Sequence, residues 1–120
     1  MEPLRAKVPR GLLGRRRYIL FELFPRDKAP NRSELERSLK RTMLTLCGVV
    51  GASELELSLK AYSQRRGRGI LKTDNRSISR VLCLLLATSR VLGLSGVRVL
   101  AVSGTLRGLS RREKEAGKTL

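Results

Sequence analysis

Residues 54–73 read ELELSLKAYSQRRGRGILKT, and their pattern fixes the centre of the fold. In residues 54–63, apolar and polar side chains alternate, which predicts a half-buried β-strand. Residues 64–69 are rich in arginine and glycine and lead into a short apolar strand at 70–73. This arrangement is typical of a β-hairpin with an arginine-rich tip.

A helix is predicted on each side of this hairpin. Ser33 and Glu36 have the spacing of a capping box, apolar residues at helical spacing follow, and Gly48 is expected to end the helix in a left-handed conformation. Ser77 is expected to cap the second helix, whose apolar residues follow a 3.6-residue period as far as Gly93.

The outermost predicted elements are strands at 17–24 (RYILFELF) and 97–102 (VRVLAV). The order strand, helix, hairpin, helix, strand predicts an α+β fold, the ferredoxin-like (RRM-like) βαββαβ plait. Its four-stranded antiparallel sheet carries both helices on one face. We expect a single domain at 17–107, preceded by a flexible basic arm at 1–16 and followed at 108–120 by a basic tail or short helix.

The charge of the chain indicates a polyanionic partner. Lys and Arg number 26 against 10 Asp and Glu, which gives a net charge of +16, and 19 of the 26 are arginine. Such a field is best explained by a ligand that neutralises it, and arginine favours forked contact with phosphates. Nucleic acid is therefore the expected partner, with a membrane surface as the weaker alternative. Because aromatic residues make up only 3%, base-stacking platforms are not expected.

The composition argues against several other classes of protein. With no His and two Cys, the chain lacks the ligands of the usual zinc site. We find no carboxylate pair at catalytic spacing and no nucleophile beside an evident base, so no catalytic residue is expected. No apolar run is long enough to span a membrane, and we expect a cytoplasmic protein. Whether Cys47 and Cys83 form a disulfide stays open.

The candidate RNA-binding residues come from both ends of the chain and from the hairpin tip, and the two chain ends are expected to build one basic surface. They are Arg15, Arg16, Arg17, Arg65, Arg66, Arg68, Lys72, Arg107, Arg111 and Arg112. A solvated turn is the alternative for the tip. Lys72 and Arg98 either extend the basic patch or pair with Glu22 or Glu56. Asn75 and Arg76 form a small anion site or serve as turn and cap residues.

The sheet face opposite the helices is expected to be uncovered and to bind a protein. Strict alternation along the two outer strands in sequence turns five apolar side chains toward that face: Tyr18, Leu20, Phe24, Leu100 and Val102.

Three stretches resemble a known family. Residues 16–23 (RRYILFEL), residues 69–73 (GILKT) before an apolar helix, and residues 97–107 (VRVLAVSGTLR) are similar to protein component 2 of archaeal ribonuclease P, the Pop5 family. The last stretch is the most specific, because it resembles the family's strand running into V-S-G-T-(aliphatic)-R. The arginine-rich hairpin tip is not a signature of that family.

The resemblance implies a non-catalytic, RNA-binding subunit of ribonuclease P, the endoribonuclease that removes the 5′ leader from precursor tRNA. The expected partners are ribonuclease P RNA, precursor tRNA and the Rpp30-like component 3, with which the chain would form a heterotetramer. Magnesium is expected on the RNA, and no cofactor is expected on the protein. The competing interpretations are a ribosomal or chromatin-like architectural protein and an assembly scaffold.

Overall fold

The computed structural model describes residues 15–111, apart from the side chains of residues 53 and 54. The predicted arm before residue 15 and the tail from Arg112 onward lie outside the described residues. Residues 106–111 form a helix after the last strand. The elements before it are β1 (Arg16–Phe24), a 3-10 helix (Arg26–Lys28), α2 (Arg32–Glu54), β2 (Ser58–Ser63), β3 (Arg68–Asp74), α3 (Ile78–Val91) and β4 (Gly96–Ser103).

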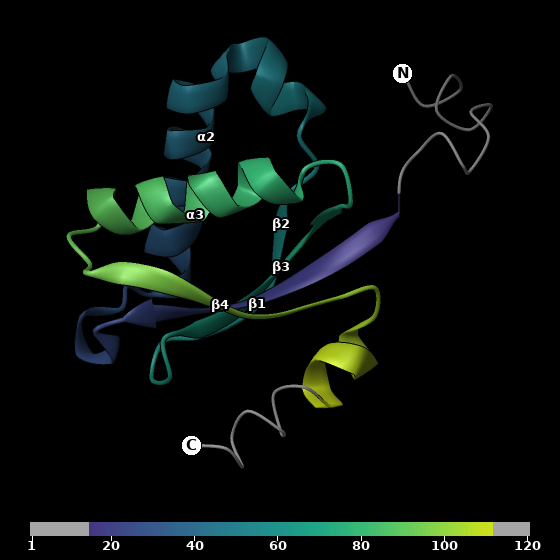
Figure 1. The fold of residues 1–120 in the computed structure, drawn as a ribbon. Coiled ribbons are helices and arrows are strands. Elements are labelled where there is room, and N and C mark those ends of the chain that lie inside the picture. The colour runs from purple at the N-terminus through teal and green to yellow at the C-terminus, as the bar shows by residue number, and fades with distance from the viewer. Residues whose placement is uncertain (1–14, 112–120) are drawn as a thin grey trace.

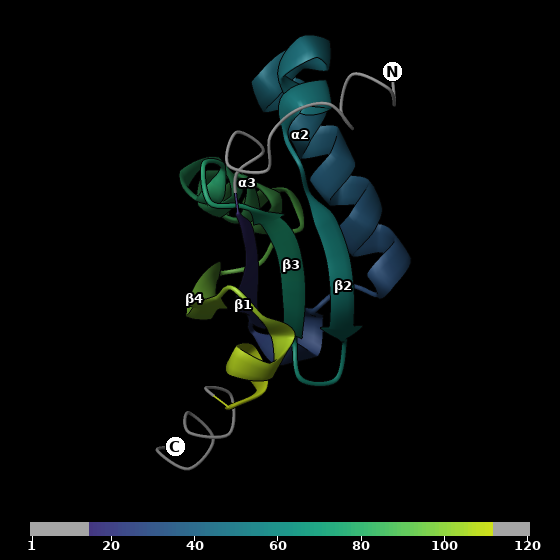
Figure 2. The ribbon, with the colours of Figure 1, turned by 90° about the vertical axis from the view of Figure 1, so that its right-hand side faces the viewer.

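The strands form one sheet in the order β2-β3-β1-β4, and each neighbouring pair is antiparallel. Helices α2 and α3 lie on the same face of this sheet, as Figures 1 and 2 show. The predicted ferredoxin-like plait is therefore confirmed. β1 is a central strand, and its residues 18–22 pair with both β3 and β4.

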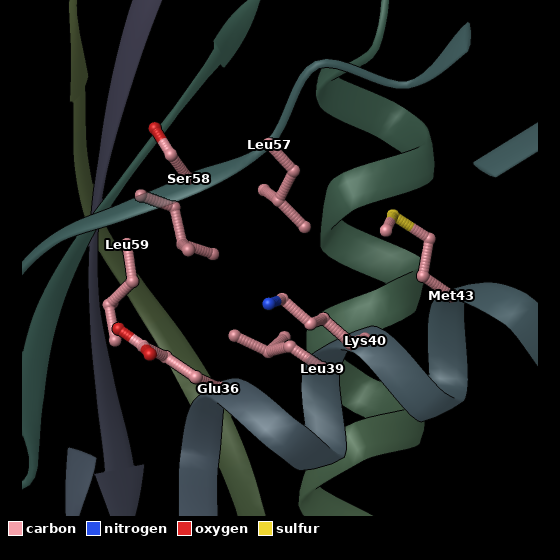
Figure 3. A pocket seen from close by; sticks show the side chains of 8 residues that line it. Glu36, Leu39, Lys40, Met43, Leu57, Ser58 and Leu59 are labelled. Carbon is pink, nitrogen blue, oxygen red and sulfur yellow. The ribbon is translucent and has the colours of Figure 1, made fainter. Parts of the chain in front are cut away.

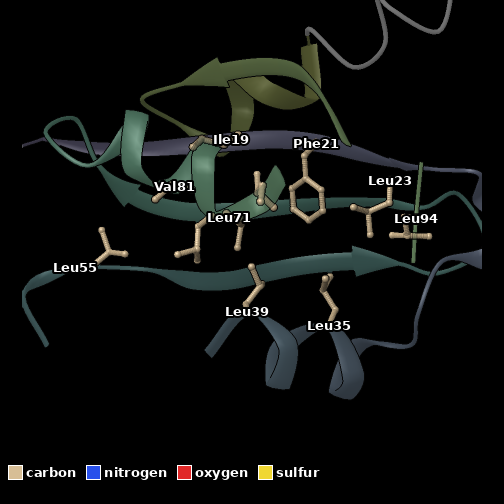
Figure 4. Packing of buried hydrophobic residues seen from close by; sticks show 11 residues of the cluster. Ile19, Phe21, Leu23, Leu35, Leu39, Leu55, Leu71, Val81 and Leu94 are labelled. Carbon is tan, nitrogen blue, oxygen red and sulfur yellow. The ribbon is translucent and has the colours of Figure 1, made fainter. Parts of the chain in front are cut away.

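The main core lies between the sheet and the two helices (Figure 4). Ile19, Phe21 and Leu23 alternate along β1 toward the helices and are almost fully buried. Each such side chain contributes about 1.5–3 kcal/mol on leaving water. The ring of Phe21 lies against Gly69 on β3, where an added Cβ would come within 2.6 Å of Phe21 Cζ. Only glycine leaves room for the ring at that position.

Helix α2 differs from its predicted bounds at both ends. It begins at Arg32, because the Asn31 side chain accepts a hydrogen bond from the Glu34 amide at 2.8 Å, so the predicted cap at Ser33 is wrong. Gly48 adopts the expected positive φ of 73°, but the helix resumes beyond it and runs to Glu54. The strand predicted from residue 54 consequently starts at Ser58.

The two cysteines are free thiols, and both line an apolar groove between α2 and α3 together with Leu46 and Leu84. Within residues 15–111, no helix combines the length and the apolar character needed to cross a bilayer.

Candidate nucleic-acid interface

Arginines from the two ends of the described chain meet at one end of the sheet. Arg16 and Arg17 open β1 opposite Asp74 and Thr73 of β3, while the end of β4 pairs with Tyr18. The Arg17 guanidinium donates to the Arg16 carbonyl at 2.8 Å and lies beside Gly104, where an added Cβ would be 3.4 Å from Nη1. The chain leaving β4 therefore passes directly along the start of β1.

The helix at 106–111 begins at the end of the segment that carries the most specific sequence resemblance, residues 97–107. Thr105 caps it, because the Gly108 amide donates to Thr105 Oγ1 at 3.0 Å and the Leu109 amide donates to the Thr105 carbonyl at 3.3 Å. The Thr105 amide in turn donates to Ser103 Oγ at 3.3 Å. A Cβ on Gly108 would collide with Ser103 Oγ, so the close turn requires glycine.

This helix lies on the face of the sheet opposite α2 and α3, in yellow in Figure 1. Leu109 is 1% exposed and packs on Leu20 and Ala101. Arg107 and Arg111 are four residues apart, hence on one side of the helix, and both are exposed. We name Arg15, Arg16, Arg17, Arg107 and Arg111 the strand-end cluster.

The expectation that this sheet face is uncovered is wrong. Leu20 is 2% exposed beneath Leu109, and Tyr18 and Leu100 pack against the same cluster. Val102 instead packs against the main core on the helix side of the sheet. Of the five predicted interface residues, Phe24 is the most exposed, at 39%.

The sequence predicts the wrong sheet face for Val102 because β4 contains a β-bulge. Leu20 pairs with Ala101, but the next residue of β1, Phe21, pairs with Val99, so Leu100 is skipped. The alternation of faces along β4 therefore changes at Leu100. A strict period of two, extrapolated through the bulge, places Val102 on the wrong side.

Exposed apolar side chains gather elsewhere, around the interruption of α2 at Gly48. The side chains of this apolar α2 patch are between 51% and 78% exposed: Leu44, Leu46, Val49 and Val50.

The sheet face opposite α2 and α3 carries, near its hairpin end, an ion-pair ladder across three strands. Glu22 of β1 is 3% exposed and lies between Arg68 of β3 and Arg98 of β4. The distances are 2.7 Å from Arg68 Nε to Glu22 Oε2 and 2.5 Å from Arg98 Nη2 to Glu22 Oε1. Burial by itself raises the pKa of Glu22, but the hydrogen bonds and positive charges of both arginines outweigh it and hold that pKa below 4.5.

Two predicted RNA-binding residues therefore have carboxylate partners. Arg68 pairs with Glu22, and Lys72 Nζ lies 4.0 Å from Glu56 Oε1. The alternative in which Lys72 and Arg98 pair with Glu56 and Glu22 is the one that the structure contains.

Asn75 and Arg76 act as turn residues before α3. Asn75 Oδ1 accepts from the Arg15 amide at 3.0 Å, and the Asn75 amide donates to the Arg15 carbonyl at 2.8 Å. Asp74 Oδ1 accepts from the amides of Arg76 and Ser77, both at 2.9 Å. The Asp74 carboxylate thus occupies the place that the predicted anion site before α3 would have offered to a ligand.

The hairpin tip lies at the other end of the sheet, a turn over residues 64–67 that carries exposed Arg65 and Arg66. The Leu23 amide donates to the Gly67 carbonyl at 2.6 Å, and Gln64 Nε2 donates to the Ala29 carbonyl at 3.2 Å. These bonds hold the tip against the 3-10 helix. The nine predicted RNA-binding residues that the structure describes consequently do not form one continuous patch.

Sequence reasoning missed the basic residues of that 3-10 helix, Arg26 and Lys28, which are exposed beside the tip. A signal for them was present, because two cations in a short segment bounded by Pro25 and Pro30 indicate a rigid, solvated turn. We name Arg26, Lys28, Arg65 and Arg66 the hairpin-tip cluster.

A pocket of about 270 Å³ lies between α2 and the start of β2 (Figure 3). Its walls are mostly apolar, and its polar rim includes Glu36 and Lys40. Glu36 is held by Arg32, with 3.0 Å between Arg32 Nε and Glu36 Oε1. The pocket offers an apolar notch and no paired acid and base. Across the described residues, no three His, Cys, Asp or Glu side chains lie together as a metal site would need.

Comparisons with known proteins agree with this architecture. A chain in a cryo-EM structure of yeast ribonuclease MRP has a similar fold, with a TM-score of 0.57 at 13% sequence identity, over 88% of this chain and 96% of that one. No curated protein matches by sequence. The family model described as Rpp14/Pop5 matches residues 17–113, which include β1 from Arg17 onward, the ion-pair ladder and the capped helix. On this match, which spans most of its length, the chain belongs to the Rpp14/Pop5 family.

Proposed function

We propose that the chain is a non-catalytic, RNA-binding subunit of ribonuclease P that supports the catalytic RNA in removing the 5′ leader from precursor tRNA. Membership of the Rpp14/Pop5 family supports the ribonuclease P assignment. The observation that carries the RNA-binding role is the strand-end cluster, in which three arginines at the start of β1 lie beside the segment that leaves β4 and carries Arg107 and Arg111.

The strand-end cluster suits phosphate binding for two physical reasons. Arginine presents a forked set of donors that matches phosphate oxygens, and a sheet holds such donors in fixed register. Leu109 fixes the helix that carries Arg107 and Arg111, so less side-chain and backbone freedom is lost on binding. RNA backbone is the ligand that these features fit.

Catalysis in this proposal is carried out by magnesium ions held by the RNA. No cofactor is proposed on the protein itself. The contribution of the protein is to lower phosphate repulsion and to hold RNA segments in place.

The proposed protein partner is an Rpp30-like subunit, with two copies of each chain in a heterotetramer. The apolar α2 patch supports a protein contact, because four large apolar side chains are exposed close together in sequence. A Val49→Glu variant should lose that partner in co-purification and keep its own thermal stability.

The decisive experiment is reconstitution of precursor tRNA cleavage from ribonuclease P RNA and the partner proteins, with and without this chain. We expect cleavage to accelerate with the wild-type chain and to fall on the order of tenfold with Arg107→Ala/Arg111→Ala at limiting protein. A matched control is Arg37→Ala/Arg41→Ala, which also removes two exposed arginines four residues apart on a helix. Equal losses in both variants, or equal affinity for duplex DNA, would favour a general architectural protein.

A further inference from the structure

The four cations of the hairpin-tip cluster come from two segments that are far apart in the sequence and are held together in the fold. Arg26 and Lys28 lie on the 3-10 helix, and Arg65 and Arg66 lie on the turn of the β2–β3 hairpin. All four are exposed, and Asp27 and Gln64 line the shallow recess between Arg26 and Arg65. With one carboxylate against four cations, the local charge is strongly positive.

Glycine at position 67 makes this juxtaposition possible. Gly67 has a φ of +65°, and a Cβ there would lie 2.8 Å from the Leu23 carbonyl oxygen and 3.7 Å from Arg26 Cα. The tip therefore packs against the end of β1 and the 3-10 helix at backbone contact. Two further bonds, from Leu23 to Gly67 and from Gln64 to Ala29, fix it there.

The hairpin-tip cluster is separate from the strand-end cluster. Three residues of the strand-end cluster, Arg15, Arg16 and Arg17, lie at the start of β1. The tip lies beyond Glu22 and Arg68, at the opposite end of β1 and β3 (Figure 1). Eight residue steps from Arg16 to Phe24 correspond to about 26 Å. This exceeds the Debye length of about 8 Å at physiological salt, so the two clusters act on different phosphates.

The ion-pair ladder lies on the hairpin side of this separation, because Arg68 directly follows the tip turn at 64–67. Glu22 is buried between Arg68 and Arg98, and its carboxylate offsets one of their two positive charges.

We infer that the hairpin-tip cluster is a second RNA-backbone contact and that the protein grips two backbone segments, one toward each end of β1, a strand about 26 Å long. This inference rests on the proposed function, because it takes RNA as the ligand. Arginine pairs with phosphate oxygens at each end, and the sheet between them sets the distance.

The test uses the full chain with its partner proteins and ribonuclease P RNA as the probe, and it measures affinity from 50 to 200 mM salt together with hydroxyl-radical footprints. Arg26→Ala/Arg65→Ala should reduce the slope of log affinity against log salt by about 1.4–1.8, since each neutralised phosphate contributes about 0.7–0.9. One of two protected RNA segments should disappear. When the tip variant is combined with Arg107→Ala/Arg111→Ala, the reductions in slope that the two variants cause should add. Arg26→Lys/Arg65→Lys keeps both positive charges and should therefore keep the wild-type slope.

The possible outcomes separate the two proposals. If the tip variant keeps the wild-type slope and both footprints while the strand-end variant loses affinity, the tip inference is overturned and the proposed function stands. If neither variant changes RNA binding, both proposals fail. If the tip variant binds RNA normally and loses a partner protein instead, the tip is a protein contact and the inference is again overturned.

Discussion

Arg68 and Glu22 face each other across β3 and β1, with 2.7 Å between Arg68 Nε and Glu22 Oε2, and both side chains are largely buried. The Glu22 carboxylate is charged in this position because Arg98 of β4 contacts its second oxygen. A central strand thus places one acid between two bases, and the ladder joins three of the four strands.

Replacement of Glu22 should therefore be costly. Glu22→Ala removes both ion pairs and leaves Arg68 buried without its carboxylate, so we expect the free energy of unfolding to fall by about 2–3 kcal/mol. Arg98→Ala should cost less, because the Arg98 side chain is 54% exposed and water replaces its partner. Urea unfolding of the two variants measures how far each lowers the free energy of unfolding. A larger decrease for Arg98→Ala than for Glu22→Ala would contradict this assignment.

The same pair predicts an acid-sensitive stability. The pKa of Glu22 is lower in the folded chain than its ordinary value of 4.5, so the unfolded chain binds a proton more readily. The contribution of Glu22 is fully present above pH 4.5 and is lost as pH falls through the lowered pKa. Thermal unfolding of wild type and Glu22→Gln between pH 7 and pH 2.5 should give curves that converge only at the acid end. A constant difference across that range would show that the charge of Glu22 is unimportant.

Leu109→Ala should lower both the stability of the chain and its affinity for RNA. Leu109 covers Leu20 and Ala101, and truncation of a buried leucine costs about 2–5 kcal/mol. Because the helix that carries Arg107 and Arg111 then loses its anchor, RNA affinity should also fall although no charge is removed. Filter binding at constant salt measures this effect. Leu106→Ala is the matched control, since Leu106 lies on the same helix and is 46% exposed. Unchanged affinity in a Leu109→Ala chain that has lost stability would separate the helix from RNA binding.

The order of elements was predictable from the sequence because each element has its own local period. The 3.6-residue period before Gly93 survives in α3, and residues 58–63 do form strand β2. The predicted alternation of faces in β2 is wrong, because a register shift between Leu59 and Ala61 places both Leu59 and Tyr62 against the main core. The strand-end cluster was predictable for a similar reason, since its arginines flank the first and last strands directly.

The remaining features depend on which residues pair between neighbouring strands. The pattern of residues within one segment carries no information about that pairing. The bulge that skips Leu100 changes the face of Val102, and only the pairing of β1 with β4 reveals it. In the same way, Arg68 meets Glu22 because β1 and β3 are neighbours with a defined offset. Arg26 and Lys28 join the hairpin tip because the turn folds back on the end of β1.

Gly67→Ala tests whether the position of the tip matters as well as its charge. An L-residue at a φ of +65° costs about 1–2 kcal/mol, and its Cβ would press on the Leu23 carbonyl, so the turn must move away from the 3-10 helix. We expect slightly lower stability, a loss of the tip footprint on RNA and an unchanged strand-end footprint. Gly93→Ala has a comparable positive φ, of +75°, with nothing within 4 Å of an added Cβ, and serves as the control for strain alone. If both variants keep both footprints, the backbone contact at Gly67 does not set the geometry of RNA binding.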